Sequence, residues 1–181
     1  MLKEIFALKK AVFIFNGDLT LRVLLPDQIS NCYVAWMNDY EVTKYTEQRF
    51  AKTTRSDIGS LLEKMFNSST DLMYGIFQDE EHIGTIKLGN INKWHMTADL
   101  SYLIGSKQHW SKGIATKAIA EMTKIGFNKL SLEKISAGVY ANNAASIRVL
   151  EKNNYFLDCV KKSHFIFENN RIDALSYARE N

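Results

Sequence analysis

The sequence has few residues that could cross-link the chain, and it has no long apolar run near its N-terminus that could anchor it in a membrane. Its 181 residues include only two cysteines and one proline. Cys32 and Cys159 lie far apart and lack metal-ligand spacing, which favours two reduced thiols packed as small hydrophobic side chains. The apolar run nearest the N-terminus, residues 11–15, is too short for a signal peptide or a membrane span. We therefore expect a cytoplasmic protein with no bound metal and no membrane contact.

A strong excess of charge of one sign is absent as well. The chain has 23 Lys and Arg against 20 Asp and Glu, for a net charge of +3. This excess is too small to predict a nucleic-acid-binding surface, although it is compatible with a small anionic ligand. No internal repeat, low-complexity segment or linker interrupts the chain, and 46% of its residues are hydrophobic. We expect one domain over residues 1–181.

The hydrophobic pattern predicts the order of the elements. Asn16-Gly17 lies between two β-rich runs and predicts a hairpin over about residues 10–24, because a type I′ turn needs positive φ at both central positions. Helical spacing follows at 26–37, and again at 55–66 with Thr53 or Thr54 as the cap. Later segments predict antiparallel strands at 72–78, 82–91 and 96–105, a helix at 114–127, a strand at 134–140, a helix at 144–152, and closing strands at 155–167 and 171–178. The fold class is α/β (α+β), with a mixed, mostly antiparallel sheet of about seven strands and about four flanking helices.

The loop W-S-K-G-I-A, residues 110–115, follows a predicted strand and opens a predicted helix. A helix N-terminus leaves main-chain N–H groups without partners, and its dipole favours a negative charge there. Gly113 lets a ligand approach the backbone, and Ala115 keeps the first turn uncrowded. The loop is therefore a candidate anion site, with an ordinary loop as the alternative. A P-loop is excluded because G-x-x-x-x-G-K-[ST] is absent.

These residues, in this order of elements, resemble the Gcn5-related N-acetyltransferase (GNAT) superfamily. Its acetyl-CoA pyrophosphate loop reads [QR]-x-x-G-x-[GA], and Gly113 and Ala115 match it. Trp110 stands where Gln or Arg is usual, as in the branch that includes the ribosomal-protein N-terminal acetyltransferases.

A second landmark of that branch, N-x-x-S-x-x-x-x-x-K-x-G-F, resembles the stretch from Asn143 onward. Asn143, Ser146 and Lys152 are in place, while Asn154 and Tyr155 replace Gly-Phe. The resemblance covers roughly residues 42–178.

The resemblance implies transfer of acetyl from acetyl-CoA to a primary amine, by direct attack of the amine on the thioester. A main-chain N–H near Leu103 and Ile104 would polarise the carbonyl. The pantetheine arm would pair with that strand where it separates from the strand carrying residues 137–139. The implied cofactor-binding residues are Leu103, Ile104, Trp110, Ser111, Lys112, Gly113, Ile114, Ala115, Thr116, Asn143 and Ser146.

Asp99 is the candidate general base, fourteen residues before Gly113, where it resembles the catalytic glutamate of histone-acetylating members. Strand alternation puts Asp99, Ser101 and Leu103 on one face. A solvated carboxylate or a salt bridge is the alternative for Asp99, and His95 is the second candidate base.

Ser146 is the candidate donor to the leaving thiolate. Many members of the superfamily carry a tyrosine seven residues after the asparagine matched to Asn143, and that position is Leu150 here. For both Ser146 and Asn143, capping of the helix is the alternative to a contact with the cofactor.

Acceptor recognition is expected from the first two helices and the loop between them. Glu47 and Arg49 are candidates for an ammonium and an acidic group of the acceptor, or else form a surface ion pair. Three functions remain open: an acetyltransferase of a small amine such as a nucleotide-linked amino sugar, an N-terminal acetyltransferase of a ribosomal protein, and a non-catalytic acyl-CoA-binding module. A free edge on the closing strands makes a homodimer an additional expectation.

Overall fold

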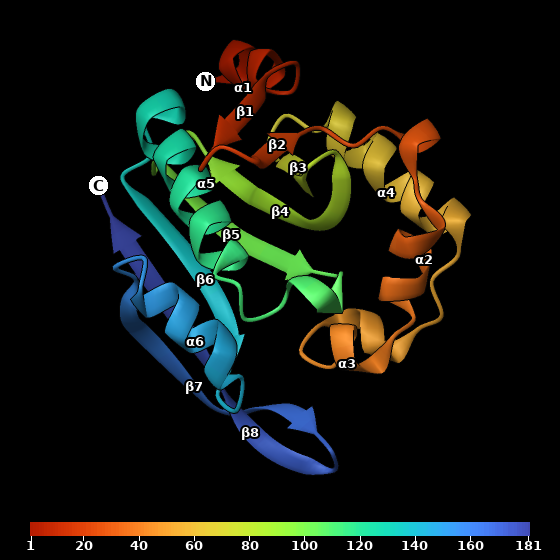
Figure 1. Cartoon of the computed structure of the whole chain (residues 1–181). Coiled ribbons are helices and arrows are strands. Elements are labelled where there is room, and N and C mark those ends of the chain that lie inside the picture. Colours follow the sequence, from red (N-terminus) through yellow and green to blue (C-terminus); the bar gives the residue numbers. More distant parts are fainter.

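The computed structural model describes residues 1–181 and builds them around one mixed sheet with helices on both faces (Figure 1). Its strands are β1 (Val12–Phe15), β2 (Leu19–Arg22), β3 (Leu72–Gln78), β4 (Glu81–Asn92), β5 (Thr97–Ile104), β6 (Lys134–Tyr140), β7 (Phe156–Phe167) and β8 (Asn170–Glu180). Its helices are α1 (Leu2–Leu8), α2 (Asn31–Met37), α3 (Tyr40–Thr43), α4 (Arg55–Asn67), α5 (Ile114–Leu130) and α6 (Ala144–Glu151), with 3₁₀ turns η1 (Pro26–Gln28), η2 (Glu47–Phe50) and η3 (Lys107–His109).

The predicted fold class is confirmed, and the counts of elements need correction. The sheet has eight strands in the order β1-β2-β3-β4-β5-β6-β8-β7, where about seven were expected. Six α-helices replace about four, because α1 and α3 are too short to give a clear helical period. The helix predicted from Pro26 is two elements, since Pro26 opens η1 and the Ser30 hydroxyl caps α2 through the Tyr33 N–H.

Local signals in the sequence placed several other boundaries well. Asn16 and Gly17 have φ values of 50° and 82°, as the predicted hairpin turn requires. Thr54 caps α4, because its hydroxyl accepts from the Asp57 N–H at 3.2 Å and the Asp57 carboxylate accepts from the Thr54 N–H at 2.8 Å.

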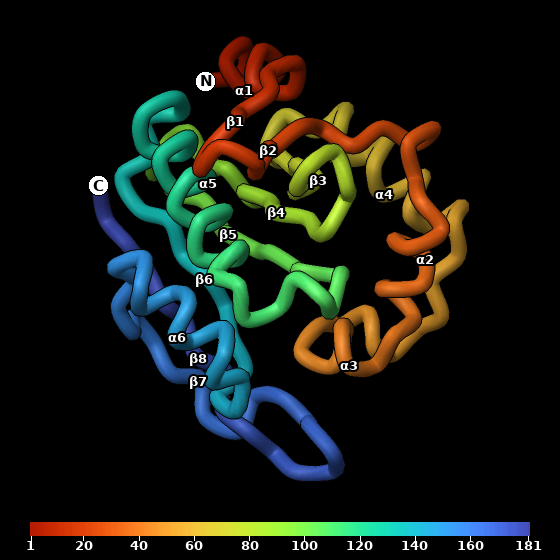
Figure 2. Tube along the Cα trace, viewed as in Figure 1, coloured from red at the N-terminus to blue at the C-terminus, as the bar shows by residue number.

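The helices divide the hydrophobic core between the two faces of the sheet. The main cluster of 28 buried residues lies under α1, α5 and α6. A smaller cluster of seven buried residues lies under α2 and α4, and Trp36 of α2 packs against it. Figure 2 shows α1 at one end of the molecule and the tip of the β7–β8 hairpin at the other.

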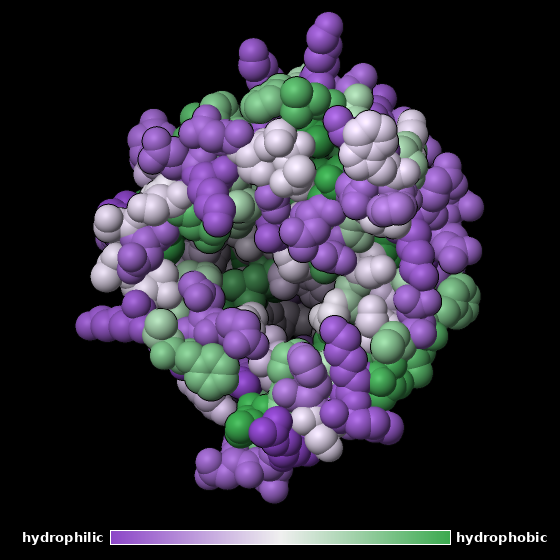
Figure 3. Space-filling view, turned by 180° about the vertical axis from the view of Figure 1, so that it is seen from behind, coloured by the Kyte–Doolittle hydropathy of each residue, from purple (hydrophilic) through white to green (hydrophobic).

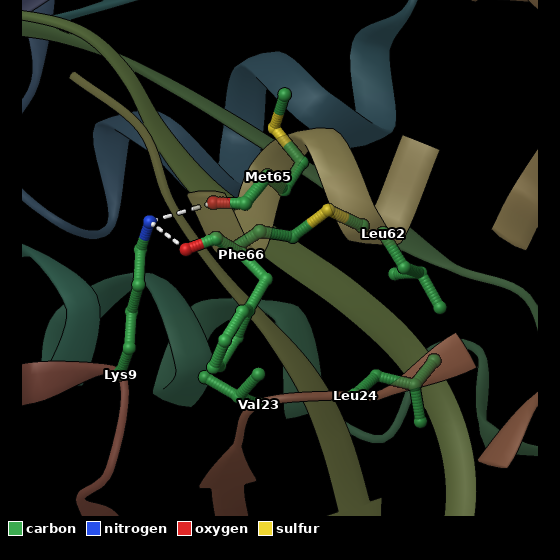
Figure 4. Close-up of a pocket in the computed structure, with 7 residues that line it drawn as sticks. Lys9, Val23, Leu24, Leu62, Met65 and Phe66 are labelled. Atoms are coloured by element: carbon green, nitrogen blue, oxygen red, sulfur yellow. Dashed lines mark hydrogen bonds between the residues drawn. The ribbon is translucent and has the colours of Figure 1, made fainter. Parts of the chain in front are cut away.

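Lys9, which follows α1, ties the N-terminus to the end of α4 (Figure 4). Its ammonium donates to the carbonyls of Met65 at 2.6 Å, Phe66 at 2.8 Å and Ser68 at 2.5 Å. Lys9 is only 4% exposed, and burial lowers its pKa. A buried cation thus satisfies carbonyls that the end of α4 leaves without intrahelical partners.

Both cysteines are free, as predicted, but the prediction that they are packed inside is wrong. Cys32 and Cys159 are exposed, on α2 and on β7. β7 is an edge strand exposed along most of its length, so its apolar residues do not mark a core position. None of the helices combines the length and apolar character needed to cross a membrane.

Candidate active site

The site begins where two parallel strands separate. β5 and β6 form the parallel pair of the sheet and are in register only from Thr97↔Lys134 to Asp99↔Ser136. Beyond Asp99, β5 remains paired with β4, and β6 with β8. We call the opening between the two strands the splay. The family resemblance implied such a separation, and the structure places it at the C-terminal ends of both strands.

Main-chain groups of β5 face the splay at alternate residues. The Gly105 N–H donates to the Ile83 carbonyl at 2.9 Å, on the β4 side. By alternation, Leu103 also turns its main chain toward β4, whereas Tyr102 and Ile104 turn theirs toward the splay. Of the two predicted residues, this geometry favours Ile104 over Leu103 as the N–H donor.

The loop from β5 to α5 leaves several N–H groups open. Gly113 is the N-cap residue of α5, with φ of 76° and no side-chain cap. The N–H groups of Ile114, Ala115 and Thr116 have no acceptor in the chain. A Cβ built on Gly113 meets nothing within 4 Å, so the space before the helix is open. An open, uncapped N-terminus on a 17-residue helix has the geometry for an anion.

Trp110 holds this loop against β5. Its indole N–H donates to the Ile104 carbonyl at 2.8 Å, and its side chain is 38% exposed. Trp110 thus holds the loop against β5 through a hydrogen bond within the chain, at a position where Gln or Arg was the expected residue. Ser111 and Lys112 lie exposed between Trp110 and Gly113.

Asp99 lies on β5 at the last register pair before the splay. Its exposed carboxylate accepts a hydrogen bond from the Asn90 side-chain amide at 2.8 Å. Asn90 has φ of 51° within an irregularity of β4 that follows Gly89. The predicted alternation is confirmed, since Leu103 packs toward α2 and α4 while Leu100 enters the main core.

His95 lies apart from this arrangement. It is exposed in the turn between β4 and β5, and its main-chain N–H donates to the Asn92 side-chain oxygen at 3.0 Å. This turn is at the end of β5 where β6 is still paired, so His95 lies away from the splay. Asp99 is the better placed of the two candidate bases.

Ser146 and Asn143 meet the splay from α6. The Asn143 side-chain oxygen accepts from the Ser146 N–H at 3.1 Å, so Asn143 is the cap. The Ser146 hydroxyl is free of that task and lies 2.5 Å from the Tyr102 hydroxyl. Sequence reasoning missed Tyr102. Alternation would have placed it opposite Asp99, but no local signal links it to a serine 44 positions later.

The departures from the second landmark have physical explanations. Asn154 stands where the pattern has glycine and takes φ of 59°, a left-handed conformation that asparagine tolerates. Tyr155 replaces phenylalanine, and its buried hydroxyl pairs with that of Thr123 at 2.8 Å. Leu150 is 1% exposed and belongs to the main core, so it adds no polar group to the splay.

Glu47 and Arg49 lie together on η2, beside the end of β6. Glu47 accepts from the Tyr140 hydroxyl at 2.9 Å. Burial raises the pKa of Tyr140 to about 12 and the bond to Glu47 acts in the same direction, so the phenol stays protonated and donates.

Arg49 already has partners within the chain. Its guanidinium donates to the carbonyls of Lys44 and Ile166, the latter at 2.7 Å. It also lies over the rings of Tyr140, at 5.0 Å, and Phe167, at 5.5 Å. Arg49 therefore ties the tip of the β7–β8 hairpin to η2. The alternative of an ion pair between Glu47 and Arg49 is not what the structure contains.

An open pocket of about 440 Å³ lies along α2, α3 and η2. Its lining residues are Met37, Asn38, Tyr40, Thr43, Gln48, Arg49, Phe50, Ala51 and Lys52. Two of them are cationic and none is acidic. Figure 3, seen from behind, shows a hollow near the middle of the molecule. In Figure 1 the same central region lies between β5, β6 and α3.

Known proteins resemble this chain over most of its length. The model of the acetyltransferase (GNAT) domain family matches residues 18–155. The uncharacterized N-acetyltransferase YoaA of Bacillus subtilis is 26% identical over 91% of this chain and 95% of its own. The uncharacterized N-acetyltransferase p20 of Bacillus licheniformis is 30% identical over 76% of this chain and 78% of its own.

Solved structures share the fold. RimL, a ribosomal L7/L12 alpha-N-protein acetyltransferase in complex with coenzyme A, superposes with a TM-score of 0.84 at 15% identity, covering 94% of this chain and 98% of its own. Spermidine N-acetyltransferase from Vibrio cholerae, in complex with CoA and spermine, gives a TM-score of 0.81 at 20% identity, covering 91% and 96%. With the family model matched over most of its length, the chain belongs to the GNAT acetyltransferases and is an N-acetyltransferase.

Proposed function

We propose that the protein transfers acetyl from acetyl-CoA to a small amine that also carries an acidic group, such as a nucleotide-linked amino sugar. The observation that supports this acceptor is the pocket along α2, α3 and η2, lined by Arg49 and Lys52 and by no acidic residue. A phosphorylated acceptor gains from these cations, and Tyr40 and Phe50 offer rings for stacking. A polyamine would meet charge of its own sign.

In the proposed mechanism, residues on the two faces of β5 have different roles. Asp99 lies on the face of α2 and α4, where it removes a proton from the acceptor amine directly or through a water. The Ile104 N–H polarises the thioester carbonyl. The amine nitrogen forms its bond to the carbonyl carbon, and the carbon–sulfur bond breaks with its electron pair left on sulfur. The Ser146 hydroxyl donates a hydrogen bond to that sulfur from the opposite face of β5.

Cofactor binding rests on the loop and on α6. The open N–H groups of Ile114, Ala115 and Thr116 receive the pyrophosphate, with Ser111 and Lys112 beside them. The free side-chain nitrogen of Asn143 is available to the pantetheine arm. Glu47 is proposed to hold the acceptor ammonium next to Tyr140, and Arg49 to contribute positive charge to the acidic group.

The alternative acceptor is a protein N-terminus, as the name of RimL states for that enzyme. Thiol release from acetyl-CoA, measured with a UDP-linked amino sugar, with ribosomal-protein N-terminal peptides and with spermidine, separates these acceptors. We expect release with the UDP-linked amino sugar. Release with the peptides or spermidine alone would contradict this proposal, and binding of acetyl-CoA without release in any pool would favour a non-catalytic module.

A matched pair of variants tests the pocket. Lys52→Ala should raise KM for the UDP-linked amino sugar about 10-fold by removing one contact to an anionic group. Lys64→Ala removes an exposed lysine of α4 outside the pocket and should change nothing. Equal behaviour of the two variants would contradict the assignment of the pocket.

A further inference from the structure

A partly buried tyrosine lies beside the hydroxyl that the proposed mechanism uses. The Tyr102 hydroxyl lies 2.5 Å from that of Ser146. Tyr102 is on β5, three residues past the last register pair with β6, and its ring packs against the main core. Ser146 is partly exposed in the first turn of α6.

The direction of this hydrogen bond follows from acidity. A phenol is a stronger acid than an aliphatic alcohol, so the phenolic hydrogen lies between the two oxygens and the serine oxygen accepts it. Asn143 caps α6, which leaves the Ser146 hydroxyl without a capping role. The hydrogen on Ser146 is then free to point away from Tyr102. A hydroxyl that accepts one hydrogen bond also donates the next one more strongly.

The surroundings of Tyr102 keep it protonated. Burial raises its pKa, the bond to Ser146 opposes this in part, and no charged side chain contributes. Arg148, the cation on α6, donates to the Ala144 carbonyl within its own helix. Asp99 lies on the opposite face of β5 and bonds to Asn90. Tyr102 is therefore a fixed donor and does not give up its proton.

We propose that Tyr102 is a positioning residue, which holds the Ser146 hydroxyl so that its hydrogen points into the splay, toward the sulfur of coenzyme A. The inference rests on the proposed cofactor site. When the carbon–sulfur bond breaks, the electron pair remains on sulfur and Ser146 donates a hydrogen bond to it. No proton leaves Tyr102, and none needs to leave Ser146. The pair thereby lowers the pKa of the bound thiol.

The test titrates the thiol of bound coenzyme A and needs no acceptor. Cys32→Ser and Cys159→Ser, both at exposed positions, leave the coenzyme sulfur as the single thiol in the complex. Thiolate absorbance against pH should give a bound pKa about one unit below that of free coenzyme A. Ser146→Ala should abolish this shift and Tyr102→Phe should remove at least half of it. The double variant should match Ser146→Ala, because Tyr102 acts through Ser146.

Control variants separate positioning from folding. Tyr74→Phe deletes the hydroxyl of another tyrosine, which is buried and bonded to the Leu8 carbonyl at 2.8 Å, and it should leave the thiol pKa unchanged. Calorimetry with coenzyme A checks binding for each variant. An unshifted pKa in the parent, an unchanged pKa in Tyr102→Phe, or independent effects of the two variants would overturn the inference. If the parent does not bind coenzyme A, the cofactor site fails and the inference fails with it. If Tyr102→Phe does not fold, an unchanged thiol pKa in Ser146→Ala overturns the inference, because Tyr102 acts only through the Ser146 hydroxyl.

Discussion

At the C-terminus of α4 the chain satisfies its own carbonyls, whereas at the N-terminus of α5 it leaves N–H groups open. Lys9 is buried against three carbonyls at the C-terminal end of α4, and its ammonium donates a hydrogen bond to each of them. Gly113 opens α5 without a side-chain cap and with free space in front. Both ends carry partial charge from the helix dipole. A helix end whose main-chain groups are hydrogen-bonded within the chain stabilises the fold. A helix end whose N–H groups are open is available to a ligand.

The largest effect is expected from closing the open end. Gly113→Glu places a carboxylate beside the N–H groups of α5, where it competes with an anionic ligand and repels a pyrophosphate. We expect calorimetric affinity for acetyl-CoA to fall at least about 1,000-fold, or about 4 kcal/mol. Gly113→Ala is the control, since it has room for its Cβ and is strained only by the φ of 76°. Unchanged binding by Gly113→Glu would remove the pyrophosphate from this loop.

Removing the hydrogen bonds of Lys9 at the C-terminus of α4 should lower the stability of the protein and leave ligand binding unchanged. Lys9→Met removes the donor from three carbonyls and should lower the free energy of unfolding by about 3 kcal/mol. Urea denaturation measures the change, with Lys10→Met as control because Lys10 is exposed in the next position. At urea concentrations below the unfolding transition, the affinity of Lys9→Met for acetyl-CoA should equal that of the parent. Equal free energies of unfolding for the two variants would contradict this prediction, because water would then replace the Lys9 ammonium without loss of stability.

The sequence predicts the open end better than the satisfied one, and the reason is distance along the chain. The loop and its helix are contiguous, so a glycine before an amphipathic pattern indicates both. Lys9 meets Met65 across 56 positions and Tyr102 meets Ser146 across 44, and no local pattern records such pairs. The strands were placed closely because their patterns are also contiguous, whereas α1 was missed because its seven residues are too few to give a clear helical period.

Asp99 lies between the two cases, with one partner and an otherwise exposed carboxylate. Asp99→Asn keeps the size of the side chain and removes its basicity. If it is the base, kcat should fall about 100-fold, at the lower end of the range of general base catalysis, with unchanged affinity for acetyl-CoA. The loss should be largest at low pH, where little of the acceptor amine is free. Asn90→Ala, which removes the partner only, should have the smaller effect, and parent activity across pH in Asp99→Asn would exclude Asp99 as the base.

The smallest effect is expected at Arg49, whose guanidinium donates to carbonyls of two segments beside the proposed acceptor pocket. A lysine lacks the planar fork that meets both Lys44 and Ile166, and it covers the rings of Tyr140 and Phe167 less well. Arg49→Lys should therefore speed amide hydrogen exchange in the hairpin tip, residues 163–170, about 5-fold, equivalent to about 1 kcal/mol of local opening. Arg148→Lys on α6 is the control and should leave the tip unchanged. If exchange in the tip is unaffected while KM for the acceptor rises, Arg49 binds substrate and the hairpin is held by ring stacking, because the rings of Tyr45 and Phe167 are stacked at 5.2 Å without it.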